Sequence, residues 1–268
     1  MIKIFTSYLI FIFASWSLSA RNIGETEITT DEGIEVFQNE KFYLLKKNVQ
    51  IISDTFSLSG DEVKVFFNKD LYDITTIYAD GLELKLFGDI FFIQKVILNA
   101  EANGINAIGN SMEIYLIDEK IIVIGLNSKL HLKNTIMLSD GRIEVNNKDG
   151  IFVLTGPNSS MSSEGINITG ENIDGQFSTI DENREVIKLN VKDEKISNIK
   201  TTDVDMYANK VIYDKKNSII ELFENVKIIR GNEIITGDYG ILNTDTNSYK
   251  VKSNNSNKVK VIITENNE

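Results

Sequence analysis

The sequence "NVQIISDTFSLSGD" at residues 48–61 returns with few changes as "NVKIIRGNEIITGD" at residues 225–238. Both copies begin Asn-Val-x-Ile-Ile, continue through a short polar break and end in Gly-Asp at the same spacing. They start 177 residues apart, so they belong to opposite ends of the chain. A pattern that recurs over such a distance predicts a structural unit that the fold uses more than once.

A shorter form of this pattern recurs between the two copies. In it, a small residue precedes Asp, Asn or Glu, and an alternating strand follows. The polar positions are Asp31, Asp61, Asp80, Asn110, Asp140, Glu171, Asn209 and Asp238. Successive members lie 30, 19, 30, 30, 31, 38 and 29 residues apart. A period near 30 predicts stacked layers of about three strands of roughly 7–10 residues, each layer burying its apolar face against the next.

The Gly-Asp pairs have a local role in this interpretation. Glycine tolerates backbone angles that other residues resist, and Asp, Asn or Glu can accept hydrogen bonds from nearby turn amides. We therefore expect each pair at a corner or bulge where a strand changes direction. A catalytic role for these carboxylates is disfavoured, because their neighbours change from one repeat to the next.

The hydrophobic period after residue 21 is close to two. Residues 63–67 (VKVFF), 82–86 (LELKL), 112–116 (MEIYL) and 143–145 (IEV) alternate apolar and polar side chains. This alternation is typical of half-buried strands, and windows with helical period are scarce. The sequence predicts an all-β protein.

Composition limits the function. The chain has 268 residues and is 42% hydrophobic, which supports a buried core. It has no cysteine, so disulfides, thiolate metal sites and a cysteine nucleophile are excluded. The net charge of −11 argues against nucleic acid and against a polybasic membrane-binding surface.

Residues 1–20 have the layout of a secretory signal peptide. Lys3 precedes an apolar run, and small residues end at Ala20, after which we expect cleavage. The alternative is an uncleaved anchor, although the apolar run is short for a membrane span. Removing the segment takes away its one charged residue, Lys3, and leaves an exported, soluble, acidic product of charge −12.

The sequence offers little to a catalytic interpretation. The one histidine, His131, alternates with Leu130 and Leu132 and is expected on the polar face of a strand. Residues 68–73 and 203–209 are acidic but lack the ligand spacing of a calcium loop. We predict no enzymatic activity, no cofactor and no metal site. A secreted β-solenoid enzyme or sugar-binding protein remains an alternative.

Residues 206–253 carry a resemblance to a known family. The frame is Ala-Asn-x-Val-x-Tyr-Asp at 208–214, Glu-Asn-Val-x-Ile at 224–228 and Ile-x-Gly-Asp at 235–238. This series resembles the OstA-like family of periplasmic lipopolysaccharide-transport proteins, and residues 30–67 resemble it more weakly. Phe223 and Glu224 depart from the Leu-x-Gly that family members often have there. The resemblance predicts one continuous β domain over residues 21–253, followed by a tail at 254–268.

The resemblance implies a β-jellyroll in which two antiparallel sheets form an open, V-shaped apolar trough, stacked as a twisted solenoid. Such a trough would hold the acyl chains of lipopolysaccharide in the periplasm. The alternate apolar residues would line it: Val63, Val65, Phe67, Leu82, Leu84, Leu86, Met112, Ile114, Leu116, Ile143, Val145, Val226 and Ile228. Periodicity alone does not predict the trough, and for any single residue it favours a place in an ordinary sandwich core.

The resemblance also implies partners. Edge strands would pair with an LptC-like jellyroll at the inner membrane, an LptD-like jellyroll at the outer membrane, and further copies of the chain head to tail. The residues expected at these edges are Ile28, Ile34, Val36, Tyr239, Ile241 and Val251. An anchored, LptC-like role for this chain itself is the second function within the same pathway.

Overall fold

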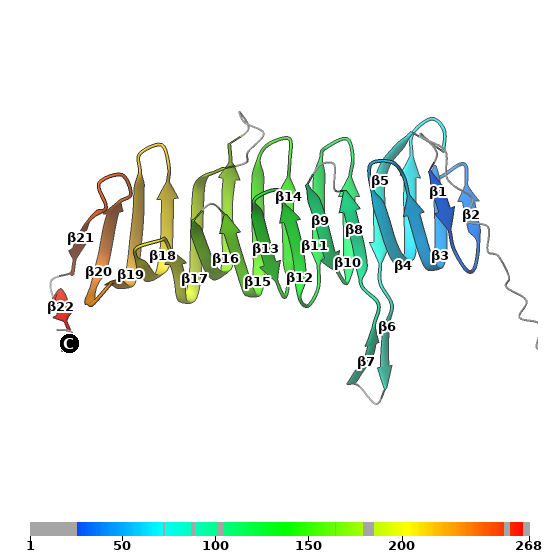
Figure 1. Ribbon diagram of the computed structural model, residues 1–268. Helices are drawn as coiled ribbons and strands as arrows, with labels where there is room; N and C mark the ends of the chain where they lie inside the picture. Colours follow the sequence, from blue (N-terminus) through cyan, green and yellow to red (C-terminus); the bar gives the residue numbers. More distant parts are fainter. Residues whose placement is uncertain are drawn as a thin grey trace, which may run out of the picture.

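The computed structural model describes residues 26–264, apart from 72, 87–88, 101–103, 164, 179–184 and 255–257, and describes no side chain from 83 to 93. Within these residues the chain forms 22 strands and no helix, as the alternation predicts (Figure 1). The first eleven strands are β1 (Glu27–Thr29), β2 (Ile34–Phe37), β3 (Phe42–Ile52), β4 (Ser57–Phe67), β5 (Ile74–Asp80), β6 (Glu83–Leu86), β7 (Asp89–Ile93), β8 (Val96–Ala100), β9 (Ile105–Gly109), β10 (Ser111–Tyr115) and β11 (Lys120–Ile124). The others are β12 (Ser128–Leu132), β13 (Thr135–Ser139), β14 (Arg142–Asn146), β15 (Ile151–Ser163), β16 (Ile166–Phe177), β17 (Val186–Lys200), β18 (Asp205–Asp214), β19 (Ile219–Arg230), β20 (Glu233–Asn243), β21 (Ser248–Lys252) and β22 (Lys260–Ile263).

Twenty of these strands belong to one hydrogen-bonded sheet that is folded along a corner. We call the two halves arm 1 and arm 2. Arm 1 contains β2, β5, β10, β11, β14 and β21, and arm 2 contains β1, β8, β9, β12, β13 and β22. The long strands β3, β4 and β15 to β20 run through the corner and contribute one part to each arm. All pairings within the sheet are antiparallel, so the layers stack as Figure 1 shows.

The corner has two forms that depend on the direction of the chain. Where β3 and β19 pass from arm 1 to arm 2, the backbone takes left-handed angles at Lys47–Asn48 and Glu224–Asn225 (φ from 49° to 65°). The pairing register shifts at both places. Asn is one of the residues that adopts this conformation at low cost, which explains its recurrence there.

Where strands pass from arm 2 to arm 1, the corner is the predicted small-plus-polar pair. The structure confirms the corner but not the reason we expected for glycine, because neither Gly60 nor Gly237 has a left-handed φ. Their role is close approach. A Cβ on Gly237 would lie 2.5 Å from Cγ1 of Val251 and 2.7 Å from the carbonyl oxygen of Lys252. Strand crowding, not backbone freedom, therefore selects glycine here.

The polar residues of successive corners bond to one another. The Asn48 amide donates to the Asp31 carboxylate at 2.5 Å, and Asn225 donates to the Asn209 side chain at 2.7 Å. Asp140 accepts from the Asn158 amide at 2.5 Å and from the Asn127 backbone N–H at 2.8 Å. These bonds tie each layer to the next, as expected of the polar positions.

The repeat contains more and shorter strands than we predicted. One period, from Asn110 to Asp140, holds β10, β11, β12 and β13, each of five residues, in place of about three strands of 7–10 residues. Two short strands form a hairpin in arm 1 and two form a hairpin in arm 2. The prediction was wrong because it did not include the fold at the corner, which halves the length of each strand.

The irregular spacings also have a structural cause. Asp80 lies at the end of β5, where the chain leaves arm 1. Asp61 and Asn110 instead lie at corners where the chain passes from arm 2 to arm 1. The β6–β7 hairpin is inserted between Asp80 and β8, and it forms a separate two-stranded sheet that projects from the body in Figure 1. The long spacing after Glu171 includes a bulge in β17 between Lys192 and Ser197.

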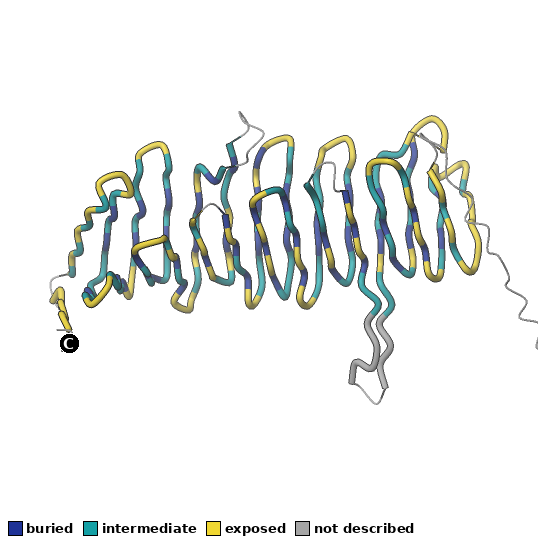
Figure 2. The backbone as a smooth tube through the Cα atoms, in the orientation of Figure 1, coloured by how far each residue is buried: buried dark blue, intermediate teal, exposed yellow. Residues whose placement is uncertain are grey.

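The fourteen-residue pattern is therefore one half of a layer. Each copy starts at the left-handed Asn of one corner, runs out and back along arm 2, and ends at the Gly-Asp of the next corner. The inward side chains of both arms form a single buried cluster that extends from Tyr43 to Leu242. Figure 2 shows the buried positions alternating along the strands of the stack from β3 to β20.

Candidate functional site

The interior between the arms is the first candidate site. Nine of the thirteen predicted lining residues are at most 7% exposed and belong to the single apolar cluster. They are Val63, Val65, Phe67, Met112, Ile114, Ile143, Val145, Val226 and Ile228. They face the interior from both arms, but in this structure they pack against one another and are not open to solvent. Any ligand between the arms would have to separate them.

Four predicted lining residues lie elsewhere. Leu116 is 45% exposed because β10 ends at Tyr115 and the chain turns there. Leu82 is half-buried at the base of the inserted hairpin, while Leu84 and Leu86 belong to β6, outside both arms. Their side chains in β6 are outside the described residues. The insertion has the same alternation as the body, so the sequence pattern could not separate the two.

The middle of arm 2 carries buried hydroxyl groups that the sequence analysis missed. The side chains of Thr135 and Ser163 bond at 2.9 Å, as do those of Ser139 and Ser159. Ser128 donates to the carbonyl oxygen of Gly125 at 2.7 Å. Each of these hydroxyl groups therefore has a hydrogen-bond partner, so burying it does not leave an unpaired polar group away from water. They share the alternate, inward positions of β12, β13 and β15 with apolar residues such as Met137 and Met161, which was the available signal.

His131 lies on β12 between two buried leucines and is half-buried on the outer face, as predicted. Among the described residues, no group of three or more His, Asp or Glu side chains is placed to hold a metal ion. No helix in the described part of the chain has the length and apolar character of a membrane span.

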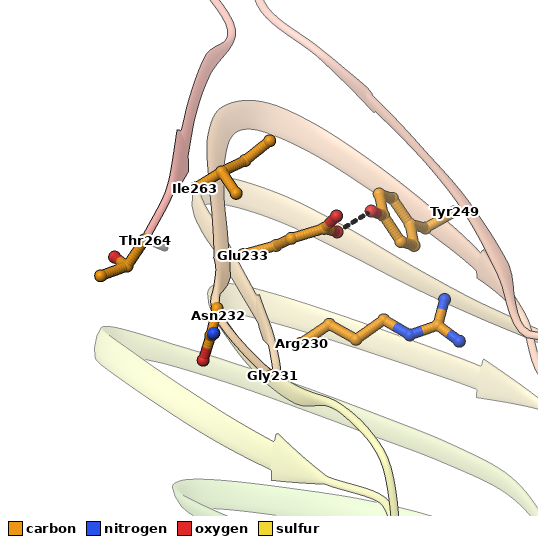
Figure 3. A pocket seen from close by; sticks show the side chains of 7 residues that line it. All are labelled: Arg230, Gly231, Asn232, Glu233, Tyr249, Ile263 and Thr264. Atoms are coloured by element: carbon orange, nitrogen blue, oxygen red, sulfur yellow. Dashed lines mark hydrogen bonds between the residues drawn. The ribbon is translucent and has the colours of Figure 1, made fainter. Parts of the chain in front are cut away.

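The second candidate site is an open pocket of about 960 Å³ at the C-terminal end of the stack, shown in Figure 3. It lies where β21 continues arm 1 and β22 continues arm 2, so it is the mouth of the interior. We call it the C-terminal mouth. Its lining residues are Arg230, Gly231, Asn232, Glu233, Tyr249, Ile263 and Thr264.

Polar bonds connect the two arms across the C-terminal mouth. The Tyr249 hydroxyl of arm 1 donates to the Glu233 carboxylate of arm 2 at 2.8 Å (Figure 3). This hydrogen bond is the main reason that the pKa of Tyr249 is raised. At the free margin opposite the corner, Arg230 donates to the carbonyl oxygen of Asn247 at 3.1 Å, and the Asn247 amide donates to Asp203 at 3.3 Å.

The ends of the folded sheet are the third candidate site. Within the described residues, β1 and β2 pair with β3 alone, and β21 and β22 pair with β20 alone. Their outer edges are free to accept another strand. Ile28, Ile34 and Val36 lie on the N-terminal edge strands, and Ile34 and Val36 are exposed.

At the C-terminal end, one of the three predicted edge residues is on an edge strand. Val251 lies on β21, but Tyr239 and Ile241 lie on β20, which β21 and β22 cover. The expected tail contributes the second edge strand, because residues 260–263 rejoin the sheet as β22. Val261 and Ile263 on that strand are 54% and 67% exposed. The basic-apolar sequence at 257–263 was the signal that we assigned to a tail.

The aromatic side chains of arm 1 form a row on its outer face. Phe42 stacks on Phe37 with ring centroids 4.5 Å apart, and Phe66 packs edge-on against Tyr78 at 5.5 Å. The Lys64 ammonium lies 3.9 Å from the centre of the Phe42 ring. These rings bind mainly to one another across strands, and such pairs stabilise a sheet.

The sequence matches no protein-family model and no curated protein. Among solved structures, the chain is similar to LptH from Pseudomonas aeruginosa, described as the LptA-homologous periplasmic component of its lipopolysaccharide transport device. The match covers 90% of this chain and 96% of LptH at 8% identity, with a TM-score of 0.22. A TM-score this low does not establish a relationship.

Proposed function

We propose that this chain is an LptA-like bridge component of lipopolysaccharide export in the periplasm. The observation that carries the proposal is the apolar interior, which extends as one cluster through every layer between two arms. The OstA-like sequence pattern at residues 206–253 supports the same function. In this role the protein binds and passes on lipid and performs no catalysis.

The apolar interior meets the main energetic need of such transport. Exposing one methylene group to water costs about 0.8 kcal/mol, so an acyl chain of roughly a dozen carbons costs on the order of 10 kcal/mol. An apolar compartment that extends through successive layers removes this cost over the whole path. Sugars and phosphates would remain outside in water.

Acyl chains can enter only if the arms move apart, because the predicted lining residues are buried. The arms are joined by continuous strands at the corner. At the C-terminal end of the free margin they are joined by hydrogen bonds from the Arg230 side chain to the Asn247 carbonyl oxygen and from the Asn247 amide to the Asp203 carboxylate. Side-chain hydrogen bonds of this kind are worth about 1 kcal/mol each, so opening at the free margin is much easier than opening at the corner. We infer that the corner is the hinge.

The free end strands would connect the protein to its partners. A strand from an LptC-like or LptD-like jellyroll, or from a second copy head to tail, can extend the sheet beyond β2 or β22. Exposed apolar residues at both ends, including Val36 and Ile263, would be buried by such pairing. The chain would then form part of a continuous conduit.

Photocrosslinking in a Gram-negative cell tests the lipid-binding interior. A photoreactive residue replaces Val65, which is buried in β4, and in the control replaces the adjacent Lys64 on the outer face. We expect lipopolysaccharide adducts at position 65 and none at position 64. A folded, exported protein that gives no adduct at position 65 would contradict the proposal.

The anchored, LptC-like role makes a different prediction about residues 1–20, which lie outside the described residues. The mass of the mature protein decides between the two roles. Loss of residues 1–20 supports the bridge component, and their retention supports the anchored partner.

A sugar-binding protein is the alternative from another class. The aromatic row on arm 1 is the feature that such a protein could use. Phe37 and Lys64 both lie against the Phe42 ring, and Lys64 also lies 4.9 Å from the centre of the Phe66 ring, so these two rings are already engaged in contacts within the sheet. We therefore prefer the lipid-binding proposal.

A further inference from the structure

The β6–β7 hairpin is a feature that neither the interior nor the end strands use. It is inserted between β5 and β8 and pairs in register Glu83 with Ile93 and Leu84 with Phe92. Its base is fixed to the body, since the Gly81 N–H donates to the Asn110 carbonyl at 2.8 Å. Beyond the base it forms a sheet of its own and projects from the stack (Figure 1).

A two-stranded sheet by itself is only marginally stable in water, and a third strand or a packed face is needed. The hairpin has two outer edges, and they are not equivalent. The register shifts between Leu84 and Lys85, which leaves Phe91 as an extra residue in β7. A bulge of this kind blunts an edge against pairing, whereas β6 carries no extra residue. The β6 edge is therefore the one suited to accept a strand.

The sequence of this edge is complementary to itself. Residues 82–86 read Leu-Glu-Leu-Lys-Leu. If two copies pair antiparallel about Leu84, Glu83 of each copy lies opposite Lys85 of the other, and Leu82 lies opposite Leu86. Opposite charges and apolar residues that face each other across strands are both stabilising. A two-fold axis makes each contact twice.

We propose that two copies of this chain associate side by side through β6, forming a four-stranded sheet in the order β7–β6–β6–β7. The hairpin leaves the stack between β5 and β8, so this association does not use β1, β2, β21 or β22. It is thus independent of head-to-tail pairing.

A lipid bilayer is a poorer partner for the hairpin, because unpaired sheet edges are not tolerated in hydrocarbon. The net charge of −11 also opposes an anionic lipid surface.

Charge reversal tests the pairing. The variant Glu83→Lys places a lysine opposite Lys85 of the other copy, and Lys85→Glu places a glutamate opposite Glu83, so each single variant creates two like-charge contacts. We expect sedimentation equilibrium of the mature protein to show a dimer that each single variant weakens by about tenfold or more. The double variant Glu83→Lys/Lys85→Glu restores opposite charges and should restore the dimer. Glu40→Lys and Lys69→Glu, in exposed turns, are the matched controls.

A cysteine at the axis gives a second measurement that head-to-tail association cannot mimic. The natural chain has no cysteine, so Leu84→Cys introduces the only thiol. We expect a disulfide-linked dimer on mild oxidation, and none from Lys69→Cys.

The proposal is overturned if the protein is monomeric, if the single charge variants associate like the natural chain, or if the folded double variant stays monomeric. Binding of a monomeric single variant to phospholipid vesicles through the hairpin would also overturn it.

Discussion

The two copies of the fourteen-residue pattern build the same half-layer in different surroundings. In residues 48–61 the strand with the Gly-Asp pair, β4, lies inside the stack, between β3 and the strands β5 and β8. Residues 225–238 lie near its C-terminal end, where β20 is followed only by the short strands β21 and β22 within the described residues. The shared pattern therefore specifies the path of the backbone, and the neighbours decide what each position tolerates.

The largest loss of stability is expected at the buried inward positions, and it should be the same in both copies. Ile51 and Ile228 are equivalent inward positions, and both are at most 2% exposed. Replacing either with Asp buries an unpaired carboxylate, and we expect a loss of about 4 kcal/mol or more in the free energy of unfolding. Urea denaturation measures it. The control Ile52→Asp, on the outer face of the same strand, should be tolerated. Equal losses at positions 51 and 52 would contradict the assigned faces.

Replacing the corner glycine should lower the stability by different amounts in the two copies. A Cβ on Gly237 would collide with Val251 and Lys252, whereas the nearest atom to a Cβ on Gly60 is the Asp80 carbonyl oxygen at 3.1 Å. We expect Gly237→Ala to lower the free energy of unfolding by about 2 kcal/mol and Gly60→Ala to lower it by less than about 1 kcal/mol. Thermal or urea unfolding of the pair gives the comparison. A larger effect at Gly60 would refute the account of the corners as sites of close approach.

Replacing the corner asparagine should lower the stability by a similar amount in the two copies. Asn48 and Asn225 both have left-handed φ angles, and alanine in that region costs about 1 kcal/mol. We expect Asn48→Ala and Asn225→Ala to destabilise the protein by similar amounts near that value. Glycine at the same positions should recover most of the loss, because it adopts these angles without strain. If glycine were as harmful as alanine, the side-chain bonds and not the backbone would explain these residues.

The smallest effect concerns an ion pair present at the first copy. Lys47 lies 2.9 Å from Glu32, and its counterpart before the second copy is Glu224. The hydrogen bond to Lys47 lowers the pKa of Glu32 and raises the pKa of Lys47. The stabilisation by this ion pair is present above the unfolded pKa of Glu32 and is lost as the pH falls through the lowered pKa of Glu32 in the folded protein. In alkali, the same stabilisation is lost as the pH rises through the raised pKa of Lys47.

The variant Glu32→Gln should therefore be slightly less stable than the natural chain at neutral pH and equally stable in acid. Both side chains are well exposed, so added salt should reduce the difference. Urea denaturation at the two pH values measures it. A difference that grows in acid would have the wrong sign for this ion pair.

The sequence predicted the fold class and the corners, because alternation and repeated polar positions are local properties. It placed Val63, Val65 and Ile228 on the inward face correctly. It did not reveal the second kind of corner, at the left-handed Asn, although the exposed polar pairs Lys47–Asn48 and Glu224–Asn225 interrupt the alternation of buried residues there. It also could not separate Leu84 and Leu86 from the body, because an inserted hairpin follows the same period.

The ends of the stack were predicted less well than its interior. Val36 was correctly placed on an edge strand, but Tyr239 is covered by β21. The short strand β22 follows a stretch without strand pattern, so its return to β20 depends on tertiary contacts that the sequence does not show. Partners at these edges stay a prediction.

The central claim is that lipid enters the interior by spreading the arms about the corner. Cysteines introduced by Gln50→Cys in arm 2 and Lys64→Cys in arm 1 carry spin labels on the outer faces, and the chain has no other cysteine. Electron–electron double resonance then measures the distance between the arms. The account predicts that this distance increases when lipopolysaccharide is added and is unchanged by the polysaccharide without its acyl chains. Lipopolysaccharide that binds without lengthening the distance, or that does not bind, would contradict it.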